Sequence, residues 1–122
     1  MNKLYNINIT QLKLLAKRKK IICFGCGNQG KRMAMLLGNW QCENNLKGYV
    51  DNDRNKIGTE VFIEGKKYPV YSLEMIKGYL NPNILLLITC LDYKNIYKQL
   101  ENECSINCDC VSMDEVAETE LF

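Results

Sequence analysis

The chain has 122 residues, of which 47% are hydrophobic and 25% are charged, and its formal net charge is +2. These values describe one ordinary globular domain over residues 1–122, which is short for a cofactor enzyme that carries its own substrate domain. The small net charge does not call for a nucleic-acid partner, and no apolar run approaches the roughly 20 residues of a membrane span.

The residue counts also restrict the chemistry. Histidine is absent from the sequence, which removes the commonest general base and metal ligand. The first residues lack the apolar core of a signal peptide, so we expect a cytoplasmic location. In a reducing cytosol the seven cysteines are expected to be free thiols and not a disulfide framework.

The first predicted element is a helix within residues 1–20. Asn8 or Thr10 can cap it, and the basic residues 17–20 follow its apolar positions. Cations in a last helical turn offset the helix dipole. We therefore interpret these basic residues as a solvated helix end, in preference to a nucleic-acid patch.

The predicted core, residues 21–112, alternates strands and helices. Strands are expected at 21–24, 46–50, 68–71, 83–90 and 108–112, with a short ribbon at 61–63. Helices are expected from the glycine loop to a C-cap at Gly38 and Asn39, from a cap at Ser72 to Gly78, and over 93–103. Pro69 places its strand near a sheet edge, and residues 113–122 are predicted to form a polar, acidic tail. This order predicts an α/β fold, a Rossmann-like three-layer domain with a mainly parallel sheet and helices on both faces.

A complete G-x-G-x-x-G follows the first core strand, with glycines at positions 25, 27 and 30. The first glycine permits a tight turn, the second lets a ligand approach the backbone, and the third lets the helix pack on the strand. The N–H groups of residues 27–31 are expected to face an anion at the helix start. The positive charges of Lys31 and Arg32 are unfavourable at this end of the helix, where the helix dipole is also positive. We therefore expect either that one of them reaches a phosphate or that both point to solvent.

An acidic pair follows the second core strand. Asp51 lies about 20 residues beyond Gly30, the spacing of a carboxylate that binds ribose hydroxyls. The alternative is an Asp-Asn-Asp turn in which the side chains bind their own backbone. Both interpretations stay open for Asp51, whereas Asp53 favours the turn.

The cysteines and the missing catalytic motifs limit the candidate chemistry further. Cys23 with Cys26, and Cys108 with Cys110, form close pairs, but a mid-strand cysteine behaves as a buried apolar residue, so we favour core packing over metal or redox use. No tyrosine has a lysine four residues on, and no nucleophile elbow or Walker lysine is present. The sequence thus predicts a chain that holds a nucleotide and lacks a complete catalytic set.

Five segments occur in a family-like order: residues 22–32, 48–53, 56–58, 68–74 and 84–89. They resemble the small Rossmann-like, CoA-binding-like domains of bacterial surface-polysaccharide proteins, such as the N-terminal domains of nucleotide-sugar acetyltransferases and dehydratases. The resemblance implies that the domain holds a nucleotide-diphosphate sugar while another domain performs the chemistry. It implies ligand contact at Gly25, Gly27, Asn28, Gln29, Gly30 and Asp51. Cys26 stands where the relatives usually have alanine or serine, and Gln29 where they have histidine.

We therefore expect a nucleotide-binding module for NAD or a nucleotide-diphosphate sugar, without a metal. It would act with a catalytic partner protein or as a homo-oligomer. The alternatives are an NAD-dependent sugar oxidoreductase or epimerase, and a ligand-free regulatory domain. The expected cofactor contacts are Gly25, Cys26, Gly27, Asn28, Gln29, Gly30, Lys31, Asp51, Asn52 and Thr89.

Overall fold

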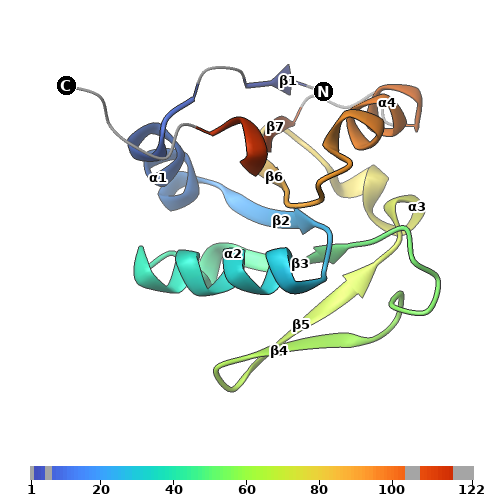
Figure 1. The fold of residues 1–122 in the computed structure, drawn as a ribbon, viewed down its shortest axis with the longest axis horizontal. Coiled ribbons are helices and arrows are strands. Elements are labelled where there is room, and N and C mark those ends of the chain that lie inside the picture. Colours follow the sequence, from blue (N-terminus) through green and yellow to red (C-terminus); the bar gives the residue numbers. More distant parts are fainter. Residues whose placement is uncertain (1, 5–6, 104–107, 117–122) are drawn as a thin grey trace.

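The computed structural model describes residues 2–4, 7–103 and 108–116. Its strands form one seven-stranded sheet in the order β1-β7-β6-β2-β3-β5-β4 (Figure 1). The strands are β1 (Asn2–Lys3), β2 (Lys20–Phe24), β3 (Leu46–Val50), β4 (Glu60–Ile63), β5 (Lys66–Tyr71), β6 (Ile84–Ile88) and β7 (Asp109–Ser112). All neighbouring strands pair in parallel except β4, which pairs antiparallel with β5.

Helices cover both faces of the sheet, which confirms the predicted Rossmann-like α/β fold. The helices are α1 (Ile9–Arg18), α2 (Asn28–Asn39), α3 (Leu73–Ile76) and α4 (Tyr93–Glu103), with single 3-10 turns η1 (Glu43–Asn45), η2 (Lys77–Tyr79) and η3 (Met113–Glu115). Buried side chains of α1 and α2 share one apolar core, and those of α3 and α4 share the other. Residues 84–88 of β6 alternate between these two cores, as a strand buried on both faces must. No helix in the described part of the chain has the length and apolar character needed to span a bilayer.

The chain order around β2 locates the switch point of the sheet. From β2 the chain continues to β3 and β5 on one side, then returns through α3 to β6 on the other side. The carboxyl ends of β2, β3 and β6 therefore meet where the direction of winding reverses. In open parallel sheets, this is the place where ligands bind.

Local sequence explains where α1 begins. Asn8 is its N-cap: the Asn8 side chain accepts from the Gln11 N–H, and the Gln11 side chain accepts from the Asn8 N–H, both at 2.9 Å. This reciprocal arrangement satisfies two donors that have no carbonyl in a preceding turn. Of the two predicted caps, Asn8 is the one used.

The predicted helix ends at glycines are wrong. Gly38 lies inside α2, and the left-handed residue beyond the helix is Gln41, with φ of 60°. The Cys42 N–H donates to the Leu37 carbonyl at 2.8 Å and the Gln41 N–H donates to the Gly38 carbonyl at 3.0 Å, which satisfies the last carbonyls. Gly78 likewise lies inside η2, after α3 has ended at Ile76. Neither Gly38 nor Gly78 adopts the left-handed conformation, so neither acts as a glycine C-cap.

The structure differs from the sequence-based expectations at one sheet edge and in the residues that follow β7. The sequence does not predict β1, which pairs with only two residues of β7. Pro69 lies in β5, one strand in from the edge strand β4, as the prediction of a position near an edge requires. The tail prediction is wrong for its first residues, because Met113 packs on the core and Val116 is buried. Its residues 117–122 lie outside the described part of the chain.

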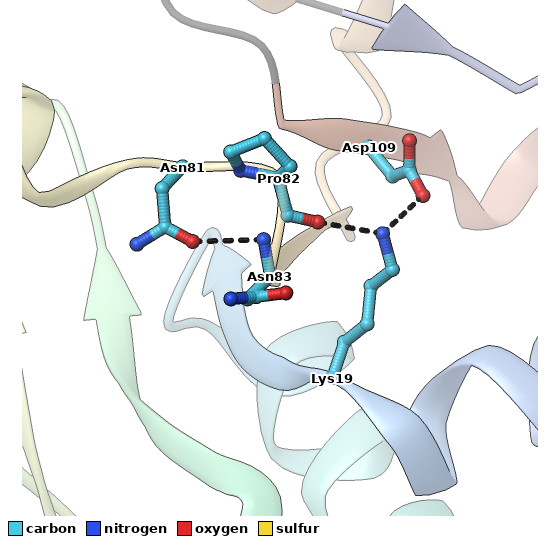
Figure 2. A network of polar contacts seen from close by, with 5 residues as sticks. All are labelled: Lys19, Asn81, Pro82, Asn83 and Asp109. Atoms are coloured by element: carbon cyan, nitrogen blue, oxygen red, sulfur yellow. Dashed lines mark hydrogen bonds and ion pairs between the residues drawn. The ribbon is translucent and has the colours of Figure 1, made fainter.

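A polar network ties α1 to the amino end of the sheet (Figure 2). The Lys19 ammonium group donates to Asp109 Oδ2 at 2.6 Å and to the Pro82 carbonyl at 2.7 Å. Asn81 Oδ1 accepts from the Asn83 N–H at 2.8 Å, which closes the turn before β6. This network lies at the end of the sheet away from the switch point, so we assign it to stability.

Candidate functional site

The loops that follow β2, β3 and β6 enclose a hollow of about 220 Å³ at the switch point. We call it the first hollow. Its lining residues are Gly25, Gly27, Asn28, Gln29, Gly30, Asp51, Thr89, Cys90 and Leu91. The structure thus brings seven of the ten expected contact residues together, although they come from three separate parts of the sequence.

Two of the three loop glycines are required by the fold. Gly25 has φ of 109°, and a Cβ there would lie 2.7 Å from Cys90 Sγ and 2.9 Å from Thr89 Oγ1. A Cβ on Gly30 would lie 2.2 Å from the Gly25 carbonyl oxygen and 2.9 Å from a ring carbon of Tyr49. Real Cβ atoms do not approach so closely, so both positions need glycine for the turn and for helix-strand packing.

Gly27 is different, because nothing in the fold requires a glycine there. Its φ of −75° and ψ of −158° suit any residue. Beyond its chain neighbours and its own helix, the described residues place one atom within 4 Å of a Cβ built on Gly27, the Lys56 Nζ at 3.9 Å. The missing side chain leaves the backbone open to the first hollow.

The first turn of α2 faces the same loop. Gly27 is the N-cap and has no side chain that could accept from the helix. The N–H groups of Asn28, Gln29 and Gly30 have no carbonyl in a preceding turn, and the helix dipole places partial positive charge at this end. The arrangement favours a negatively charged or strongly accepting ligand group.

Asp51 holds the glycine loop from the neighbouring strand. Its Oδ2 accepts from the Cys26 N–H at 3.0 Å, and its Oδ1 accepts from the Asp53 N–H at 2.9 Å. Both interpretations of Asp51 thus have a structural basis, since it forms the predicted turn and also lines the first hollow. Each oxygen keeps a further lone pair that could accept from a ligand hydroxyl.

The charge state of Asp51 follows from these contacts. Partial burial raises the pKa of its carboxyl, but the two N–H donors and the Lys56 charge outweigh this effect and bring the pKa below its ordinary value. Asp51 is therefore an ionised acceptor at neutral pH. Asp53 accepts from the Asn55 N–H at 2.9 Å, as the turn interpretation expects.

Lys56 is the residue that the sequence analysis missed. The Lys56 N–H donates to the Asp53 carbonyl at 3.0 Å, and its carbonyl accepts from the Thr59 hydroxyl at 2.6 Å. In the described part of the chain, no hydrogen bond or ion pair holds its ammonium group, which lies next to Gly27. A signal was present, because a lysine in the loop after an acidic strand end can reach the same edge of the sheet.

The cysteines and Thr89 around the loop are protonated donors. Burial raises the pKa of Cys23 to about 12 and, together with the Asp51 carboxylate, raises that of Cys26 to about 11. Burial also raises the pKa of Cys90, whose thiol donates to the Phe24 carbonyl at 3.3 Å. The Thr89 hydroxyl is within 3.2 Å of the Phe24 and Gly25 carbonyls, so its proton is engaged.

Three of the expected contact residues do not line the first hollow. The Cys26 side chain packs in the core shared with α1 and α2. Lys31 is exposed on α2. Asn52 exchanges two hydrogen bonds with Gln99 of α4, at 2.7 and 2.9 Å.

Metal binding or disulfide formation in this chain would depend on its acidic and cysteine side chains. Within residues 2–4, 7–103 and 108–116, no three acidic or cysteine side chains gather as a metal site would require. The cysteines at 23, 26, 42, 90 and 110 are free thiols; of these all but Cys90 are buried, and Cys108 is buried as well. Cys23, Cys26, Cys108 and Cys110 lie in the two apolar cores, which confirms their interpretation as core residues.

Comparisons with known proteins give no relative. No family model, no curated protein and no solved structure matches this chain. The function must therefore be argued from the site itself.

Proposed function

We propose that this domain binds a nucleotide through its diphosphate at the first hollow, as a nucleotide-diphosphate sugar or NAD. The proposal rests mainly on the accessible backbone at Gly27. The fold explains glycine at positions 25 and 30 by close contacts, whereas position 27 has room for a side chain and carries none. A ligand that approaches the backbone closely is a physical reason for glycine at such a position.

The charges around the loop support an anionic ligand. The first turn of α2 has no side-chain cap, and the Lys56 ammonium group, which has no ion pair with any described residue, lies 3.9 Å from the place of a Gly27 Cβ. Main-chain N–H groups and a lysine together are a common phosphate-binding set. Asp51 lies at the end of β3, where its remaining lone pairs suit ribose hydroxyls.

The same residues support binding more than proton transfer. Cys26 and Cys90 are thiols at neutral pH, because burial raises the pKa of each. The Asp51 carboxylate is ionised and bound to two N–H groups. We therefore propose that catalysis is supplied by a partner protein or another chain. The resemblance to domains of surface-polysaccharide proteins suggests nucleotide-sugar metabolism as the setting.

Thermal unfolding with and without ligand tests the proposal, with UDP, UDP-glucose, ADP, NAD and CoA as probes. A probe present at 100 times its Kd stabilises the fold by about 2.7 kcal/mol. For a 122-residue chain, this corresponds to a Tm increase of about 10 °C. If none of the five probes raises the Tm, the proposal is wrong.

Gly27→Val is the decisive variant, and Gly78→Val is its control, because a Cβ at Gly78 meets nothing within 4 Å and Gly78 does not line the first hollow. Gly27→Val should fold and lose the ligand-induced shift, since its side chain occupies the ligand's approach. Gly78→Val should keep the shift. An unchanged shift in Gly27→Val would place the ligand elsewhere.

Lys56→Met provides an independent variant that leaves the glycine loop intact. Removing one charge-assisted contact should weaken a diphosphate about tenfold and reduce the dependence of binding on salt. Lys20→Met, which removes an exposed lysine at the other end of β2, should change neither property.

A further inference from the structure

A second hollow of about 200 Å³ continues from the first one. The two share three lining residues, Gln29, Thr89 and Leu91. The second hollow lies between α2 and η3, away from Asp51. The two hollows are therefore neighbours, and a ligand held at the glycine loop lies next to the second hollow.

The second hollow has one apolar and one polar set of lining residues. The apolar set is Met33, Leu36, Leu91 and Met113. The polar set contains Arg32 on α2 and Asp114 on η3, with the Gln29 amide and Thr89 between the two hollows. Among the described residues, neither Arg32 nor Asp114 has an ion pair or a hydrogen bond through its side chain.

The wall that carries Asp114 is anchored on both sides. Tyr97 of α4 accepts from the Ser112 N–H at 3.0 Å and donates to Glu115 Oε1 at 2.9 Å. Met113 packs on the core beside the buried Val116. Asp114 therefore lies on a turn between two anchored residues, and its exposed side chain lines the second hollow with no hydrogen bond or ion pair to any described residue.

We propose that the second hollow binds a hydroxyl-rich group, such as a sugar, attached to the distal phosphate of the nucleotide. This inference rests on the proposed function. A hydroxyl both donates and accepts, so a polyol can bind the Asp114 carboxylate and the Arg32 guanidinium at once. A third phosphate would be repelled by Asp114. The apolar side chains give a sugar ring a surface to lie on.

The test compares UDP with UDP-glucose by calorimetry, and ADP with ADP-ribose as a second pair with another base. In the wild-type protein, the sugar-bearing member of a pair should bind at least fivefold more tightly than the bare diphosphate. In Asp114→Ala this advantage should disappear, while the affinity for the bare diphosphate stays the same or increases. Removing a negative charge from the site cannot lower the affinity for an anion by an electrostatic effect alone. A loss of affinity that is confined to the sugar conjugate would therefore identify recognition of its hydroxyl groups.

Lys98→Ala is the control, because Lys98 is an exposed residue of α4 outside both hollows. It should leave both affinities unchanged. If neither the bare diphosphates nor their sugar conjugates bind, the proposed function fails and the inference fails with it. If a bare diphosphate binds but its sugar conjugate has no advantage, or if Asp114→Ala weakens both equally, only the inference is overturned.

Discussion

Replacing Lys19 by methionine tests how much of the stability depends on the network at the amino end of the sheet. Methionine keeps most of the apolar stem and removes the ammonium group that joins Asp109 to the Pro82 carbonyl. The two bonds are short, at 2.6 and 2.7 Å, and the Lys19 and Asp109 side chains are 21% and 18% exposed. The pair is therefore neither a solvated surface pair nor a fully buried one.

The expected loss follows from this intermediate burial. Exposed ion pairs contribute about 0–1 kcal/mol, whereas hydrogen bonds to charged groups contribute about 1.5–3 kcal/mol. We expect Lys19→Met to lower the free energy of unfolding by about 2 kcal/mol. With an unfolding entropy of about 2.1 cal/mol/K per residue and 122 residues, the Tm should fall by about 8 °C.

Urea denaturation and thermal unfolding, both followed by circular dichroism, measure the effect. Lys20→Met is the matched control, because Lys20 is exposed at the next position, and it should change stability by less than about 0.5 kcal/mol. A double-mutant cycle with Asp109→Asn isolates the coupling of the pair from the other contacts of Asp109. If Lys19→Met and Lys20→Met are equally stable, the reasoning about partial burial is refuted.

Two further predictions concern the glycine loop. Asp51→Asn should lower the free energy of unfolding by about 1 kcal/mol at pH 7, because it weakens the bonds to the Cys26 and Asp53 N–H groups. The folded-state pKa of Asp51 lies below its ordinary value of 3.8, so this stabilisation is complete above that value and disappears as the pH falls through the folded-state pKa. Urea denaturation at pH 7 and pH 3 measures it, and an equal difference at both values would contradict it. Gly30→Ala should lower the free energy of unfolding by about 1–3 kcal/mol, because its Cβ would lie 2.2 Å from the Gly25 carbonyl oxygen. Gly38→Ala in the same helix should raise the free energy of unfolding by about 0.5–1 kcal/mol. Equal Tm values for these two variants would show that the close contact is not formed.

The sequence predicted the backbone of the candidate site but only some of its side chains. The glycine spacing located the loop: close contacts require glycine at positions 25 and 30, and the missing side chain at position 27 leaves the backbone open. Lys56 and Asp114 were not predicted as site residues, because the position of Lys56 beside Gly27 and that of Asp114 at the second hollow depend on how loops and helices pack. Asn52 was expected to contact the ligand but binds Gln99 instead, whereas its neighbour Asp51 faces the glycine loop.

The sequence by itself determined the fold class and the order of the elements. Hydrophobic alternation, capping residues and glycine spacing are local signals, and they fix which residues form strands and where a turn can approach a ligand. Only the tertiary structure decided which glycine the fold does not need, which lysine lies beside it, and that Met113 and Asp114 line the second hollow. Those facts depend on contacts between residues far apart in the sequence, and no local pattern encodes such distances.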